Sequence, residues 1–192
     1  MLPSLRDFPV LALVADGFSQ TDLETLRRAL TGRGADFQVV CAGSEAKALI
    51  GIDSGETLLS CRPLDSLRAD EFQALVLPGG PLSADALRND ARALALVRDF
   101  QSQRKPILAV GHAVWILASA GLVSGRRIST PLSIQDDLRN AGAVCVEASS
   151  AQDANWLTLG QSDAWLPFLR SALTLLERAW SAPPSPQVPQ SA

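Results

Sequence analysis

The chain has few of the residues that form disulfide frameworks and metal centres, and it has no long hydrophobic run of the kind that spans a membrane. It contains one histidine and three widely spaced cysteines (Cys41, Cys61 and Cys145), which indicates neither a disulfide framework nor a cysteine-rich metal site. No stretch approaches the roughly 18 apolar residues of a membrane span, and the N-terminus lacks the apolar core of a signal peptide. We therefore expect a cytoplasmic protein with no metal, no cofactor and no membrane attachment.

The chain also lacks a large excess of either charge: it has 17 basic and 20 acidic residues, which give a net charge of −3. Such a balance offers no basic surface for nucleic acid, so we expect no nucleic-acid partner. With 192 residues, of which 47% are hydrophobic, the chain can bury the core of one domain. We expect that domain over residues 1–180. Residues 181–192 are rich in Pro, Ser and Gln, which predicts a disordered tail.

Strand and helix patterns alternate along the chain. Short apolar runs predict buried strands, and apolar residues at helical spacing predict helices that begin at capping residues. The predicted strands cover residues 9–15, 37–41, 74–77, 106–110, 143–147 and 155–159, and a hairpin covers 48–61 with its turn at 53–55. The predicted helices start at the Thr21–Glu24 capping box and then cover 90–103, 113–120, 133–140 and 166–180. This βαβ alternation predicts an α/β fold with a parallel sheet covered by helices on both faces.

The most informative segment is the predicted strand-to-helix turn after residue 110. In α/β hydrolytic and amidotransferase-like proteins, a nucleophilic side chain occupies such a turn. Here the turn residue is Gly111, which has no side chain, and the only histidine of the chain, His112, follows it. Nucleophilic catalysis at this turn is therefore not expected.

Four segments, in order, carry a resemblance to a known family. They are Leu75-Val76-Leu77-Pro78-Gly79-Gly80, the following Asp85-Ala86-Leu87-Arg88, residues 120–127 (AGLVSGRR) and residues 133–143 (SIQDDLRNAGA). Together they resemble the PfpI/ThiJ superfamily, which is class I glutamine amidotransferase-like, and within it the intracellular-protease-like branch. The resemblance spans about residues 9–178 and implies a flavodoxin-like parallel sheet sandwiched by helices. It also implies a homodimer or a larger homo-oligomer.

The resemblance implies a cysteine at the position of Gly111, followed by the histidine that is present as His112. It places an acidic residue at Asp22 and a second one, which orients the histidine across a subunit contact, at Asp85. The vestigial site thus comprises Gly111, His112, Asp22 and Asp85. The residues expected to line a ligand site are Asp22, Gly79, Gly80, Gly111, His112, Ala113 and Trp115.

Three functions remain open on the sequence. The first is a non-catalytic protein of this family that binds a small ligand or a partner. The second is a divergent hydrolase, glyoxalase or lyase that uses Asp22 and His112 on a small carbonyl substrate. The third is a structural or oligomerisation module like the C-terminal domain of large catalases. Cys41, at the end of a predicted strand on the same sheet edge, is the one candidate to replace the absent thiol.

Overall fold

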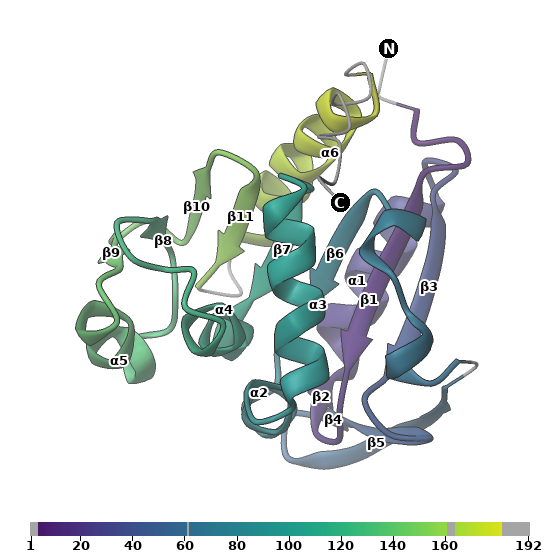
Figure 1. Ribbon diagram of the computed structural model, residues 1–192, viewed down its shortest axis with the longest axis horizontal. Helices are drawn as coiled ribbons and strands as arrows, with labels where there is room; N and C mark the ends of the chain where they lie inside the picture. The colour runs from purple at the N-terminus through teal and green to yellow at the C-terminus, as the bar shows by residue number, and fades with distance from the viewer. Residues whose placement is uncertain (1–3, 61, 161–163, 182–192) are drawn as a thin grey trace, which may run out of the picture.

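The structure is a computed structural model that describes residues 4–60, 62–160 and 164–181. Its centre is a sheet of six strands in the order β10-β11-β7-β6-β1-β3 (Figure 1). The strands are β1 (Pro9–Val14), β3 (Asp36–Cys41), β6 (Ala74–Leu77), β7 (Ile107–Val110), β10 (Ser150–Asp153) and β11 (Trp156–Leu159). All neighbours pair in parallel except β10, which lies antiparallel to β11 at one edge. The predicted α/β fold with a parallel-rich sheet is confirmed.

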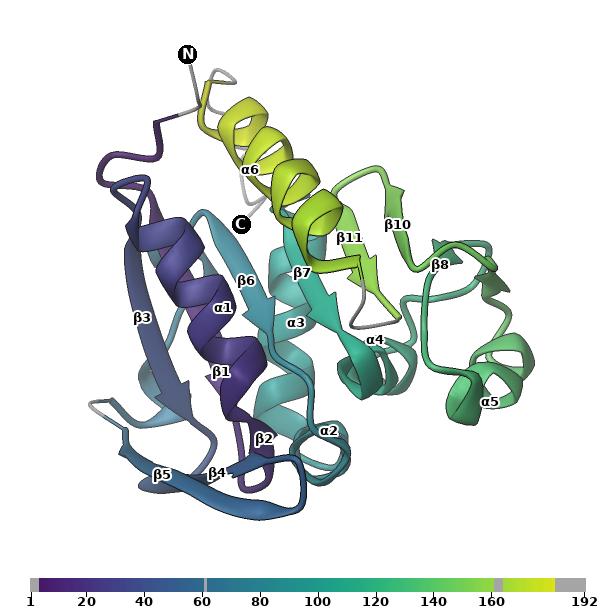
Figure 2. The same ribbon diagram turned by 180° about the vertical axis from the view of Figure 1, so that it is seen from behind.

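Helices cover both faces of this sheet. On one face lie α1 (Gln20–Thr31) and α6 (Trp165–Ser181), which Figure 2 shows in front of the strands. On the other lie α3 (Ala91–Ser102) and α4 (Val114–Ser119). Because successive side chains of a strand point to opposite faces, Val10, Ala12 and Val14 of β1 pack toward α1 and α6. Leu11 and Leu13 pack into the other half of the core.

The remaining elements lie outside this six-stranded sheet. Among the described residues, β2 (Phe18–Ser19), β4 (Glu45–Ile50) and β5 (Asp53–Leu59) form a small second sheet, and β8 (Arg127–Ile128) pairs with β9 (Val144–Cys145). The short helices are α2 (Pro81–Arg88) and α5 (Gln135–Asn140), with single 3-10 turns η1 (Leu64–Ser66), η2 (Ala69–Glu71), η3 (Gly111–Ala113) and η4 (Leu132–Ile134). No helix in these described ranges is long and apolar enough to cross a membrane.

Several predicted boundaries were wrong, each for a local reason. The hairpin turns at residues 51–52 rather than 53–55, because Ile50 pairs directly with Asp53 and Gly51 is a typical residue of a two-residue hairpin loop. The cap of α1 is Ser19 rather than Thr21, since the Oγ of Ser19 accepts the backbone N–H of Asp22 at 3.2 Å.

Several elements had no counterpart in the prediction, among them helix α2 and strands β2, β8 and β10. Helix α2 begins directly after the Gly79-Gly80 turn, with Pro81 at its first position, where proline is favoured. Strand β10 is short and largely polar, so its sequence lacks the apolar signal of a buried strand. The predicted tail, apart from Ser181, lies outside the described residues.

Candidate functional site

The candidate site is a pocket of about 240 Å³ at the carboxyl ends of β1, β6 and β7. Strand β1 lies between β3 and β6. The next strand of this sheet along the chain, β3, is added on one side of β1, and β6 is added on the other side. Ligands of open α/β sheets bind at such a switch point. The pocket is lined by Gly17, Ser19, Asp22, Leu49, Gly51, Gly79, Gly80, Pro81, Gly111 and His112.

Gly111 forms the sharp turn that links β7 to the helical segment behind it. Its φ is +57°, in the left-handed region that side chains with a Cβ adopt at a cost of roughly 1–2 kcal/mol. A Cβ built on Gly111 would meet no atom within 4 Å. The turn therefore has the predicted strand-to-helix geometry, and open space lies where a side chain would project.

Asp22 projects from the first turn of α1, and its carboxyl group lies against the backbone of Gly79. A Cβ at Gly79 would overlap Asp22 Oδ2, so only glycine permits this close approach. Burial raises the pKa of Asp22 above its usual 3.8, while hydrogen bonds with the Ser19 side chain and the Gly79 backbone oppose that rise. The protonated form of Asp22 therefore persists to higher pH than that of an exposed aspartic acid.

His112 is half-buried at the pocket wall. Burial lowers the pKa of its imidazole below the usual 6.5, because desolvation disfavours the charged form. Its Nε2 lies 3.2 Å from the Oγ of Ser133, which belongs to η4. At neutral pH the ring is therefore neutral, with one nitrogen held by a hydroxyl group.

The pocket carries few charges. Asp22 and His112 are the two titratable groups among the described residues that line it, and neither lysine nor arginine is among them. The described residues also contain no cluster of three or more His, Cys, Asp or Glu side chains suited to a metal ion. The polar groups that face the pocket thus suit hydrogen bonding to a small molecule.

The structure brings together five of the seven residues expected at a ligand site: Asp22, Gly79, Gly80, Gly111 and His112. The other two lie beside the pocket. Ala113 is fully buried in the core, and the indole of Trp115 contacts His112 on one side and Asp137 on the other. Asp85 is exposed on α2, and no contact between it and His112 is present within this chain.

The two described cysteines do not line the pocket. Cys41 is fully buried, with its Sγ 3.6 Å from the carbonyl oxygen of Leu58. Cys145 lies on β9, and burial raises the pKa of its thiol. Cys61 lies outside the described residues. Since Cys41 does not line the pocket, the geometry gives no support to its replacing a nucleophile at the turn.

Sequence reasoning missed five lining residues: Gly17, Ser19, Leu49, Gly51 and Pro81. Ser19 carried a usable signal, because a serine one residue before a helix is a favoured cap. Leu49 and Gly51 reach the site from the β4–β5 hairpin, and their local sequence gives no sign of that long-range contact.

Comparison with known proteins agrees with this architecture. The model of the DJ-1/PfpI family matches residues 9–175. The deglycase TK1284 of Thermococcus kodakarensis is 33% identical over 160 residues, which are 82% of this chain and 94% of that protein. Protein/nucleic acid deglycase 2 of Escherichia coli is 32% identical over 169 residues, 87% of this chain and 96% of its own.

Among solved structures, a ThiJ/PfpI family protein from Pseudomonas syringae superposes with a TM-score of 0.77 at 26% identity, covering 99% of this chain and 81% of that one. The sheet order, the turn at Gly111 and the family match over most of the sequence agree with one another. The chain belongs to the DJ-1/PfpI family.

Proposed function

We propose that the chain is a non-catalytic member of the DJ-1/PfpI family that binds a small molecule in the pocket beside Gly111. The observation that carries this proposal is the turn itself: Gly111 has the positive φ of a strand-to-helix elbow and no side chain. The resemblance puts the family's cysteine at this position. Without a thiol there, the turn carries no nucleophile for covalent chemistry.

The volume and charge of the pocket suit a small uncharged ligand. A pocket of about 240 Å³ lies below the roughly 300–1,000 Å³ of sites for drug-sized molecules. Burial raises the pKa of Asp22 and lowers that of His112, so it disfavours the charged form of each. Protonated Asp22 can donate to a carbonyl oxygen, and no lysine or arginine of the described lining would balance an anion. We infer that the ligand is a small polar molecule with a carbonyl or hydroxyl group.

Acetamide and acetate test this inference, because they have nearly the same shape and differ in charge. His112 is the only histidine, so its ring signals in an NMR titration report on the pocket alone. We expect acetamide to shift these signals saturably and acetate at pH 7 to leave them unchanged. The affinity for acetamide should rise as the pH falls through the raised pKa of Asp22, since only the acid form donates.

Two variants control the titration. Asp22→Asn keeps a neutral donor, so it should bind acetamide without the pH dependence. Asp136→Asn, which changes a carboxyl group that is 92% exposed on α5, should behave as the unmodified protein does. Equal or stronger binding of acetate would contradict the uncharged-ligand proposal.

An enzyme remains a second candidate, favoured by a specific observation. Asp22 and His112 face one pocket, and burial shifts the pKa of each, as is common for titratable groups of active sites. Relatives at 32–33% identity are named deglycases. In this alternative, Asp22 protonates the oxygen of a small carbonyl substrate while neutral His112 accepts a proton. Turnover by the unmodified protein that is abolished in the His112→Ala variant would favour this enzyme over the non-catalytic protein.

We also propose that the protein forms a homodimer through the region around the Gly79-Gly80 turn and the segment after Gly111. Asp85 is exposed on α2, where an interface could place it near the His112 of the partner. Light scattering at tens of micromolar is expected to give at least twice the 20.4 kDa mass of the chain. A monomer would refute the dimer and, with it, the role of Asp85.

A further inference from the structure

The imidazole of His112 is held by side chains that lie outside the pocket. Its Nε2 is 3.2 Å from Ser133 Oγ, and its ring centroid lies 5.4 Å from that of Trp115 with the planes inclined by 59°. Within the described residues, Nε2 is the ring nitrogen that makes a hydrogen bond, and Nδ1 makes none. One edge of the ring is thus occupied, and the other nitrogen is left for a ligand.

Ser133 is itself well anchored, although its side chain is exposed. It lies two residues after Pro131, whose ring restricts φ, and directly before Ile134, which is 2% exposed in the core. Upstream, the backbone N–H of Ser129 donates to Thr158 Oγ1 at 2.8 Å in the buried interior. Such an anchored turn can hold a hydroxyl group at a fixed place beside His112.

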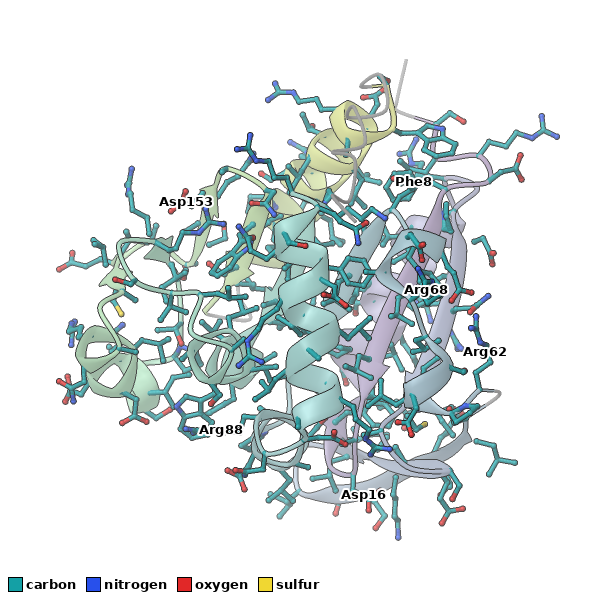
Figure 3. The ribbon with its side chains drawn as sticks, in the orientation of Figure 1. Phe8, Asp16, Arg62, Arg68, Arg88 and Asp153 are labelled. Carbon is teal, nitrogen blue, oxygen red and sulfur yellow. The ribbon has the colours of Figure 1, made fainter. Side chains whose placement is uncertain are left out.

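The side chain of Trp115 is held by residues of two further elements, α5 and α2. Its Nε1 donates to Asp137 Oδ2 on α5 at 3.0 Å, and the Arg88 guanidinium lies 5.2 Å from its ring centroid. Arg88, labelled in Figure 3, extends from the end of α2 and donates from Nε to Ser119 Oγ at 3.1 Å. The indole therefore forms a rigid wall against which the imidazole packs.

We infer that Ser133 is the positioning residue of the site: its hydroxyl group, with Trp115 as a wall, fixes the ring of His112 so that Nδ1 is the nitrogen available to a ligand. This rests on the proposed function only in that His112 faces the ligand. The family resemblance places orientation of the histidine on Asp85 across a subunit contact, whereas within one chain the contact comes from Ser133.

The surroundings of the ring also restrict its proton. A neutral imidazole carries its proton on one nitrogen. A hydroxyl group can accept from a protonated Nε2 or donate to a bare one, so this bond holds the ring in either tautomer, and the unequal surroundings of the two ring nitrogens decide between them. We therefore expect His112 to populate one tautomer predominantly, unlike free histidine in fast exchange.

The test is ¹⁵N NMR of the single histidine in the full chain without ligand, at a pH where the ring is neutral. The unmodified protein should show two well-separated ring nitrogen signals and ring proton shifts displaced by the Trp115 indole. Ser133→Ala should move both sets toward the values of free histidine, and Ser133→Thr should restore them. Ser102→Ala, which removes a surface hydroxyl bonded to Asp99 on α3, should change nothing.

Two results would overturn the inference. One is a folded Ser133→Ala protein whose histidine signals match the unmodified chain. The other needs no variant: averaged nitrogen signals in the unmodified protein would show that the two ring nitrogens have equal surroundings, as in a ring that is not held. Because neither measurement uses a ligand, failure of acetamide binding would refute the proposed function and leave this inference standing.

Discussion

Replacing Gly111 with cysteine should produce a folded protein with an unusually reactive thiol. A Cβ at this position meets no atom within 4 Å, so the strain of the left-handed backbone, about 1–2 kcal/mol, is the main cost. The thiol would enter a pocket that holds His112 as a neighbouring base and Asp22, whose acid form can donate a hydrogen bond to the thiolate. We expect alkylation by iodoacetamide at pH 7 about tenfold faster than that of free cysteine.

Gly125→Cys is the matched control for this variant. Gly125 also has a positive φ, of +73°, and open space around a built Cβ, but it does not line the pocket. Its thiol should react as an ordinary exposed cysteine does, and peptide mapping should distinguish both from the native Cys41, Cys61 and Cys145. Equal rates for the two introduced thiols would show that the pocket no longer activates a nucleophile.

Replacing Gly80 with alanine should destabilise the protein far more than an alanine at Gly111. The φ of Gly80 is +116°, and a Cβ there would overlap the carbonyl oxygen of Gly17 and lie 2.8 Å from Phe18 Cα. Backbone atoms cannot move aside as the end of a side chain can, so strain and overpacking add. We expect a loss of about 3 kcal/mol, or roughly 10 °C in Tm for a chain of this size.

Gly125→Ala separates backbone strain from overpacking in this experiment. It introduces a Cβ at positive φ into open space, so thermal unfolding should show a loss of only about 1 kcal/mol. If Gly80→Ala unfolded at the same temperature as Gly125→Ala, the close approach between the Gly80 turn and β2 would not constrain the site. That result would contradict the geometry assigned to this wall of the pocket.

Local patterns were sufficient to predict the alternating layers. Leu23, Leu26 and Leu30 repeat at helical spacing, and all three are buried against the sheet. The four-residue strand β7 is wholly apolar because both faces of a parallel sheet are covered. Each of these patterns lies within a single helix or strand, so it can be recognised in one sequence without knowledge of distant contacts.

The parts of the site that escaped prediction depend on contacts between distant residues. Ser133 reaches His112 across 21 positions, and Leu49 lines the pocket from a hairpin whose turn was placed two residues too late. Neither contact leaves a local pattern of hydrophobicity or capping. By contrast, Gly111 was identifiable because a strand, a turn residue and a helix are consecutive in sequence.

The central claim is that the pocket at Gly111 is non-catalytic because the turn lacks a thiol, and the most direct test is the rate at which the unmodified protein consumes a small dicarbonyl such as glyoxal. Glyoxalase and deglycase assays should give the background rate at any protein concentration, because the turn carries no nucleophile. Turnover well above background, lost in His112→Ala and retained when Cys41 is replaced by serine, would contradict the claim. It would show that Asp22 and His112 catalyse the reaction without a cysteine.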